Sequence, residues 1–221
     1  MNRILKMSTE KKMHLIEHGR DKDLDILVND PNINVRMYVA EHGRDKDLDI
    51  LVNDPDVNVR SAVARHKRDK DLDILVYDEK WYIRTIVAQM GRDKDLDILV
   101  NDHNRAVRIN VARMARNKDL DILVHDSECG IRMEVAKHER GKDLDILVHD
   151  DESCVRKYVA QIGRDKDLDI LIHDKDPEVR AEIIKSAKPK YLYILRHDKE
   201  SFIRKKAIAK LLYLGRKTLL M

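Results

Sequence analysis

The stretch Gly19–His42 reads GRDKDLDILVNDPNINVRMYVAEH, and the next stretch, Gly43–His66, reads GRDKDLDILVNDPDVNVRSAVARH. The chain therefore repeats itself with a period of 24 residues. An aspartate recurs six residues before each member of an arginine series, and that series is Arg36, Arg60, Arg84, Arg108, Arg132, Arg156, Arg180 and Arg204. Self-similarity at a fixed period of this length is the signature of a repeat architecture, so it constrains the fold before any other feature.

Each repeat is predicted to form two short helices. In the first, Asp21 suits an N-cap, and Leu24, Leu27 and Val28 make an apolar stripe with the spacing i, i+3, i+4. Ile26 is also apolar but lies off that stripe, which predicts that the helix is buried on two sides. We expect this first helix to be about two turns long and partly 3₁₀ in character.

The second helix is predicted to begin at Asp30, which is followed by a proline at the first helical position. Val35, Val39 and His42 then recur at i, i+4 and i+7, and Gly43 suits a C-cap, as do its equivalents Gly91 and Gly163. Helices this short are marginal alone, so the repeats must bury their apolar faces against their neighbours.

The ends of the chain depart from the repeat. Met13–His18 matches the second half of a repeat, preceded by Ser8 as a cap, and the last helix is predicted to run to Leu214. We therefore expect a single domain over residues 1–221. It would consist of an N-terminal cap and half repeat (1–18), eight repeats (19–210) and a C-terminal cap (211–221).

The recurring frame L-x-I-L-V-x-D-x-x-x-x-V-R-x-x-V-A resembles the leucine-rich repeat variant, whose units are also 24 residues long, and its Asp-x4-Val-Arg step is similar to HEAT repeats. The resemblance covers residues 13–214. It implies an all-α, right-handed solenoid of two helical layers with Asp30, Arg36 and their equivalents as a structural ladder. Proteins of this family can carry an N-terminal cysteine cluster that holds iron and sulfur, but this chain has no cysteine before Cys129, so we expect no cofactor.

Composition narrows the function. The 221 residues carry a net charge of +3 with 38% charged residues, and no apolar run approaches the ~18 residues of a membrane span. The N-terminus lacks the features of a signal peptide, and two cysteines cannot staple a chain this long, so we expect a cytoplasmic protein. Cys129 and Cys154, in adjacent repeats, are expected to stay unpaired.

Catalytic and metal-binding motifs are missing from the sequence. We expect a protein that is not an enzyme, with a HEAT-like DNA glycosylase as the least favoured alternative. The recurring RDKD segment (Arg20–Asp23 in the first repeat) leads into Leu24 and Asp25, and Asp21–Asp25 resembles the start of a calcium loop. The match is poor, because Ile26 and Asn32 occupy the positions of the loop's glycine and bidentate acid, so we expect no calcium site. The charges of the RDKD segment are expected to be exposed, and Arg20 and Lys22 to form lateral ion pairs with the aspartates of the next repeat. The histidine columns (His18, His42, His66 and His138; His125, His149, His173 and His197) are expected to be structural or solvated rather than ligands of zinc.

Within the second helix, the variable positions are those of Asn34, Met37, Tyr38 and Glu41, which share one helical face. Exposure alone does not explain this variation, because the RDKD positions hardly change. Either the face drifts neutrally or it binds a protein partner, and we favour the second interpretation. Trp81 is expected to be packed. The residues expected to bind the partner are Tyr38, Arg65, Tyr82, Ile86, Arg113, Lys137, Tyr158, Lys185 and Lys205.

Positive charge is concentrated at the C-terminal end. From Lys185 to Met221 there are eleven Lys or Arg against two acidic residues, a net charge of +9, so the rest of the chain carries −6. This predicts an alternative function, nucleic-acid binding through phosphate contacts. The residues of that alternative are Lys188, Lys190, Arg196, Lys199, Lys205, Lys206 and Lys210. The sequence identifies neither the partner nor the oligomeric state.

Overall fold

The computed structural model describes residues 3–186 and 188–218, with side chains up to residue 215. Contacts between Cα atoms divide the chain into two compact units, Met1–Met114 and Ala115–Met221, which we describe separately. Every regular element over the described residues is helical, so the predicted all-α solenoid fold is confirmed. The prediction of one single domain stays a prediction. None of the described helices is both long enough and apolar enough to cross a membrane.

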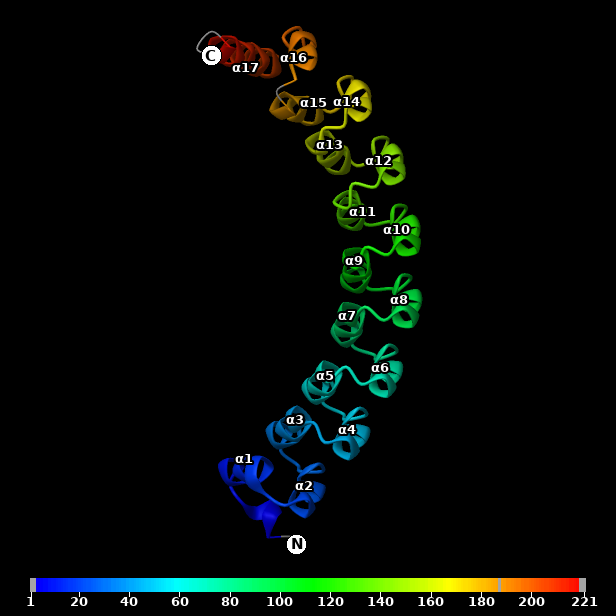
Figure 1. Cartoon of the computed structure of the whole chain (residues 1–221), viewed down its shortest axis with the longest axis vertical. Coiled ribbons are helices and arrows are strands. Elements are labelled where there is room, and N and C mark those ends of the chain that lie inside the picture. The colour runs from blue at the N-terminus through cyan, green and yellow to red at the C-terminus, as the bar shows by residue number, and fades with distance from the viewer. Residues whose placement is uncertain (1–2, 187, 219–221) are drawn as a thin grey trace. The chain divides into compact units, whose positions relative to one another are not determined.

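In the first unit, the two helices of each repeat form two rows (Figure 1). The chain enters through a 3₁₀ turn, η1 (Ile4–Lys6). The first helices are α2 (Asp21–Leu27), α4 (Asp45–Leu51), α6 (Asp69–Leu75) and α8 (Asp93–Leu99). The second helices are α1 (Thr9–His18), α3 (Ile33–His42), α5 (Val57–Arg65), α7 (Trp81–Met90) and α9 (Arg105–Arg113).

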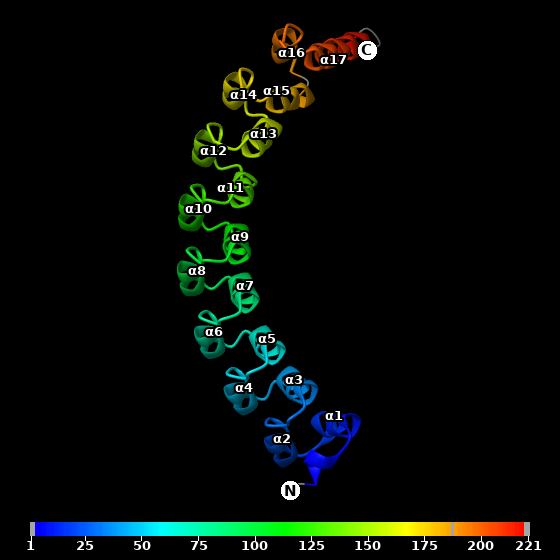
Figure 2. The ribbon, with the colours of Figure 1, turned by 180° about the vertical axis from the view of Figure 1, so that it is seen from behind.

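The second unit has the same two rows, which Figure 2 shows from behind. Its first helices are α10 (Asn117–Leu123), α12 (Gly141–Leu147), α14 (Asp165–Leu171) and α16 (Pro189–Leu195). Its second helices are α11 (Cys129–Ala136), α13 (Ser153–Ile162), α15 (Pro177–Ile183), which continues into the 3₁₀ turn η2 (Ile184–Ser186), and α17 (Ser201–Thr218). The last helix thus passes through Gly215, beyond the predicted end at Leu214.

The helix starts differ from the prediction. Arg20, not Asp21, is the N-cap of α2, and the first helices are α-helical over seven residues rather than partly 3₁₀. Helix α3 begins at Ile33 with Asn32 as its N-cap, two residues after the predicted start. The Asp30 carboxylate instead accepts the backbone N–H of Asn32 at 2.9 Å in the turn before the helix. The glycine C-caps are confirmed, since Gly43, Gly91 and Gly163 have φ near +80° (80°, 74° and 80°), where other residues are strained.

The core lies between the two rows of helices in each unit. Leu48 and Leu51 of α4 and Val59 and Val63 of α5 are fully buried, and their equivalents in the other repeats are buried in the same way. The predicted burial of the first helix on two sides is wrong, because the Ile26 column faces solvent: Ile50, for example, is 49% exposed. Leucines on one stripe are enough to anchor a two-turn helix, and Ile50 falls outside that stripe.

Arginine clamps join successive repeats. In the first unit, Arg60 of α5 donates from Nε and Nη2 to the carboxylate of Asp78 in the next repeat, at 2.6 and 3.0 Å. Its Nη1 also donates to the backbone carbonyl of Asp54 at 2.8 Å. In the second unit Arg156 binds Asp174 in the same way. The predicted Asp–Arg ladder is therefore present within each unit, and each guanidinium bridges two loops.

A second set of ion pairs joins the first helices. Arg44 binds Asp47 of its own helix at 2.6 Å, and it also binds Asp21 and Asp25 of the preceding repeat at 3.0 and 2.9 Å. The sequence predicted that these cations pair with aspartates of the next repeat. The prediction of lateral ion pairs is confirmed but the predicted direction is wrong, because Arg44 pairs with aspartates of the preceding repeat. The Asp47 column is buried rather than exposed, so the RDKD segment is only partly a solvated surface.

Leucine burial can be tested by truncation. Leu75→Ala should lower the free energy of unfolding by about 2–5 kcal/mol, because Leu75 is fully buried and its loss leaves a cavity. Leu99→Ala should behave alike. Ile74→Ala is the matched control on the same helix; Ile74 faces solvent, so its change should stay below about 1 kcal/mol. Urea denaturation followed by circular dichroism measures both. A Leu75→Ala midpoint equal to that of the parent would contradict the buried leucine columns.

The clamp between Arg180 and Asp198 predicts a pH dependence. Arg180 holds the pKa of Asp198 below its ordinary value, and this outweighs the opposite effect of burial. A depressed folded-state pKa stabilises the fold fully above about pH 4, and that contribution is lost as the pH falls through the folded-state pKa. Asp198→Asn should therefore be less stable than the parent at neutral pH, and the difference in unfolding free energy should shrink in acid. Urea titrations at a series of pH values measure it; a difference independent of pH would refute the clamp.

Candidate binding face

Many variable positions of the second helices are accessible in each unit, but not all of them are. The buried ones include Ser61 of the Met37 column and Ala62, Asn110, Glu134 and Glu182 of the Tyr38 column. Tyr38 on α3, Tyr82 and Ile86 on α7, and Tyr158 on α13 are half-buried. The predicted cations lie on or at the ends of other second helices and are exposed, namely Arg65, Arg113, Lys137, Lys185 and Lys205. The constant positions of these helices, such as Val39 and Ala40, are buried. We call the accessible surface formed by the variable positions the variable face, and consider it in each unit separately.

In the first unit, side chains of neighbouring helices contact each other along the variable face. The Tyr38 hydroxyl donates a hydrogen bond to Glu17 on α1, which raises the pKa of Tyr38. Gln89 on α7 donates from Nε2 to Oδ1 of Asn110 on α9 at 3.1 Å. Burial raises the pKa of Tyr82, and the nearby Asp56 carboxylate raises it further. These tyrosines therefore expose part of a ring while the rest is packed, as expected of preorganised anchors.

In the second unit, buried acids pair with exposed lysines on the variable face. Glu134 pairs with Lys137 at 2.7 Å, and Glu182, only 4% exposed, pairs with Lys185 at 2.7 Å. Each pair lies one turn apart on its own helix. Part of the positive charge predicted for this face is therefore neutralised within the helix.

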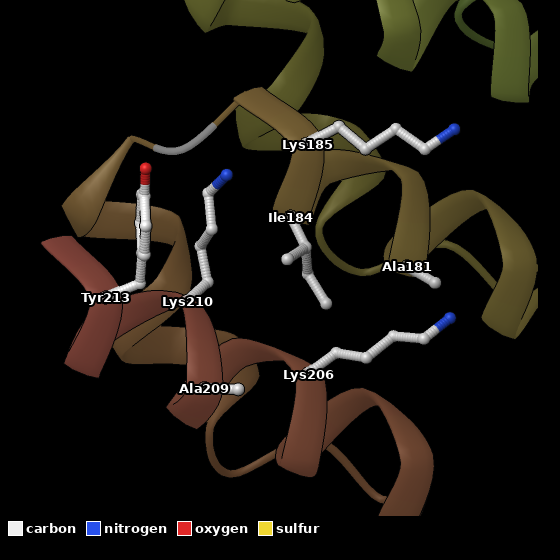
Figure 3. Close-up of a pocket in the computed structure, with 7 residues that line it drawn as sticks. All are labelled: Ala181, Ile184, Lys185, Lys206, Ala209, Lys210 and Tyr213. Atoms are coloured by element: carbon white, nitrogen blue, oxygen red, sulfur yellow. The ribbon is translucent and has the colours of Figure 1, made fainter.

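A pocket lies on the variable face between the last two second helices (Figure 3). Its volume is about 570 Å³, and it is lined by Ala181, Ile184, Lys185, Lys206, Ala209, Lys210 and Tyr213. The first three come from α15 and η2 and the others from α17, two segments that contact each other. Most of the lining surface is apolar, and the lysine ammonium groups project from its rim (Figure 3).

Two alanines explain why the hollow forms here. Ala181 occupies the column of Met37, in which every other repeat except that of Ser61 has a clearly larger side chain, including Met133 and Lys157. Ala209 occupies the column of Glu41, where the other repeats have only Glu, Arg, Gln or Lys. Small side chains at both positions leave open the space that longer side chains cover elsewhere. Sequence reasoning predicted Lys185, Lys206 and Lys210 for different functions, and it missed Ile184, Tyr213 and the two alanines.

The cations proposed for nucleic-acid binding lie on different elements. On α16, Lys188 is hydrogen-bonded to Asp165 and the Gly163 carbonyl, both at 2.7 Å, and Lys190 to Asp169 at 3.1 Å. Arg196 lies over the ring of Tyr193. Lys205, Lys206 and Lys210 are on α17, and Lys199 precedes that helix. Lys188 and Lys190 therefore continue the ion-pair ladder of the first helices.

Other residues singled out in the sequence have the following positions. Trp81 is 46% exposed, so its predicted packing is wrong. His125, His149, His173 and His197 are exposed, and His149 and His173 line one hollow of about 320 Å³. The described residues contain no group of three His, Cys, Asp or Glu side chains able to hold a metal ion.

Cys129 and Cys154 are free thiols; burial raises the pKa of Cys154, and a hydrogen bond with Cys129 raises it further.

Comparison with known proteins reveals an informative structural similarity. No family model matches the chain, and no curated protein matches it. A solved structure described as a leucine-rich repeat variant with a novel repetitive structural motif is 25% identical, with 93% of this chain and 88% of that chain covered and a TM-score of 0.76. A designed armadillo repeat protein is 12% identical over 92% of this chain and 98% of its own, but its TM-score of 0.25 gives no basis for an argument.

The similarity extends over almost the whole chain, and it agrees with the 24-residue period and with the two rows of short helices in each unit. The chain is thus a helical repeat protein with the architecture of the leucine-rich repeat variant.

Proposed function

We propose that this chain is a non-catalytic binding scaffold, and that the variable face of its second helices binds a protein partner. The observation that carries the proposal is the division of the second helix into two faces. The constant positions are buried or form the clamps, whereas many of the variable ones are accessible and include the partly exposed rings of Tyr38, Tyr82 and Tyr158. Variable side chains at accessible positions, next to constant buried columns, are what a recognition surface requires.

The mechanism is rigid display. The backbone under the variable face is held by buried leucines and by the arginine clamps, so binding orders few groups and loses little conformational entropy. Tyrosines that are half-packed before binding suit the role of anchors, since aromatic residues dominate binding hot spots. The two free thiols are consistent with a reducing compartment, and we propose the cytoplasm as the site of action.

Removing two anchors tests the proposal. Tyr82→Ala combined with Tyr158→Ala should weaken partner binding by about tenfold or more, because each substitution removes a preorganised aromatic contact. The matched control is Tyr77→Ala with Tyr193→Ala, two tyrosines that are more exposed but do not lie on the variable face. Proteins retained by the immobilised parent chain from a nuclease-treated extract would be compared by quantitative mass spectrometry, and circular dichroism would verify helicity. Equal retention by the parent and the Tyr82/Tyr158 variant would exclude this face.

Nucleic-acid binding is the second candidate, and the cations of α17 favour it. Phosphate contacts produce a linear fall of log affinity with log salt, with a slope of about −0.9 for each phosphate neutralised on duplex DNA. If α17 binds phosphate, replacing Lys205, Lys206 and Lys210 by Gln should make the slope shallower by about three. Fluorescence anisotropy of a labelled duplex across a salt series measures it. A slope that is unchanged by the three substitutions would remove α17 from any nucleic-acid interface.

A further inference from the structure

The pocket between α15–η2 and α17 combines an apolar floor with a positively charged rim. Its floor is apolar: Ile184 is buried and points into the hollow, with Ala181 and Ala209 beside it (Figure 3). Its rim carries three lysines. A volume of about 570 Å³ is within the range of roughly 300–1,000 Å³ that is typical of ligand pockets.

The charge at this rim is only partly balanced by carboxylates of the described residues. Lys185 is paired with Glu182, although it remains 71% exposed. Within the described part of the chain, neither Lys206 nor Lys210 has a carboxylate at ion-pair distance; their ammonium groups lie over Phe202 and Tyr213 of the same helix, 5.4 and 5.8 Å from the ring centroids. Lys46 and its equivalents on the first helices, by contrast, pair with aspartates of the preceding repeat.

We propose that this pocket binds a peptide segment of a protein partner in which an apolar side chain is flanked by carboxylates. The inference rests on the proposed scaffold function and adds the chemistry of the ligand. The apolar side chain would cover Ile184 and the two alanines, and the carboxylates would pair with Lys206 and Lys210. An acidic segment complements the uncompensated positive charge of the rim, and its apolar residue gains the free energy of removing the floor from water.

The apolar floor distinguishes this ligand from a nucleic acid. A phosphate backbone would pair with the lysines, but it has no apolar group to fill the hollow, so closing the hollow would leave phosphate binding unchanged. Substitutions of the rim lysines change the charge of the pocket, and substitutions of the two alanines change its shape, so the two contributions can be tested separately.

The repeats themselves supply the substitutions that fill the hollow. Ala181→Met introduces the residue that Met37 and Met133 provide in the same column, and Ala209→Gln introduces the residue of Gln89 and Gln161. Other repeats of this chain fold with those side chains, and neither alanine is buried, so the double variant should keep its stability. It changes no charge.

The probe is a fluorescein-labelled peptide Glu-Glu-Leu-Glu-Glu-Phe-Glu-Glu, titrated with the full chain by fluorescence anisotropy. Its controls are a peptide with Ser in place of Leu and Phe, and a labelled duplex. The variants are Ala181→Met/Ala209→Gln and Lys206→Gln/Lys210→Gln. The charge-matched control is Lys142→Gln/Lys166→Gln, which removes two exposed lysines from the first helices of the same unit.

We expect the Leu/Phe peptide to bind the parent, and each pocket variant to raise its Kd by about tenfold or more, while the Lys142/Lys166 control leaves the Kd within about twofold. The Ser peptide should bind at least about tenfold more weakly than the Leu/Phe peptide. The proposal is overturned if the Leu/Phe peptide does not bind, if filling the hollow leaves its Kd unchanged, or if the Ser peptide binds equally well. Duplex binding weakened as strongly as peptide binding by the filled variant would also overturn it.

These outcomes are separable from those of the scaffold proposal. If Tyr82 and Tyr158 are required for partner retention but filling the hollow does not affect the peptide, the scaffold function stands and the pocket's ligand is wrong. If filling the hollow weakens peptide binding but the Tyr82/Tyr158 variant retains partner proteins as well as the parent does, the pocket assignment stands and the wider binding face is wrong.

Discussion

The bidentate clamp between an arginine and the aspartate of the next repeat is the interaction on which the rest of the structure depends. In each unit the guanidinium is largely buried and bridges two loops, since it holds the carboxylate of one and a backbone carbonyl of the other. A buried charge that loses its partner costs several kcal/mol, so each clamp strongly favours one spacing between adjacent repeats. That spacing fixes the register of the second helices, and with it the positions of the variable side chains.

The fold could be predicted from the sequence because the same constraints recur in every repeat. The leucine columns reveal the buried core, the arginine–aspartate columns reveal the clamps between repeats, and the glycines mark helix ends with positive φ. Helix starts could not be predicted as well. Capping rules assign Asp30 to the helix terminus, but its carboxylate accepts a backbone N–H in the preceding turn and pairs with Lys12, so Asn32 caps the helix instead. Residue type alone does not reveal which of several partners a carboxylate takes.

The candidate site was less predictable because it depends on what is missing from a column. Ala181 and Ala209 looked unremarkable as variable positions, yet together they open the pocket. Lys188 and Lys190 looked like available cations, but each occupies the position of an arginine or lysine that pairs with aspartates in the preceding repeat. Positive charge counted along a sequence therefore overstates the charge that a surface can offer to a ligand.

The distribution of partners divides the molecule's charges into two classes. On the first helices, a central arginine such as Arg68 contacts three aspartates, and the neighbouring Lys70 shares one of them, so this layer is internally neutralised and its ion pairs serve stacking. On α17, Lys206 and Lys210 contact aromatic rings, and neither pairs with a carboxylate among the described residues. An ion pair already made must be broken before its charge can bind a ligand, whereas a cation over a ring keeps its charge accessible. Recognition of an acidic ligand is therefore favoured at α17 rather than along the first helices, although the first helices contain many lysines and arginines.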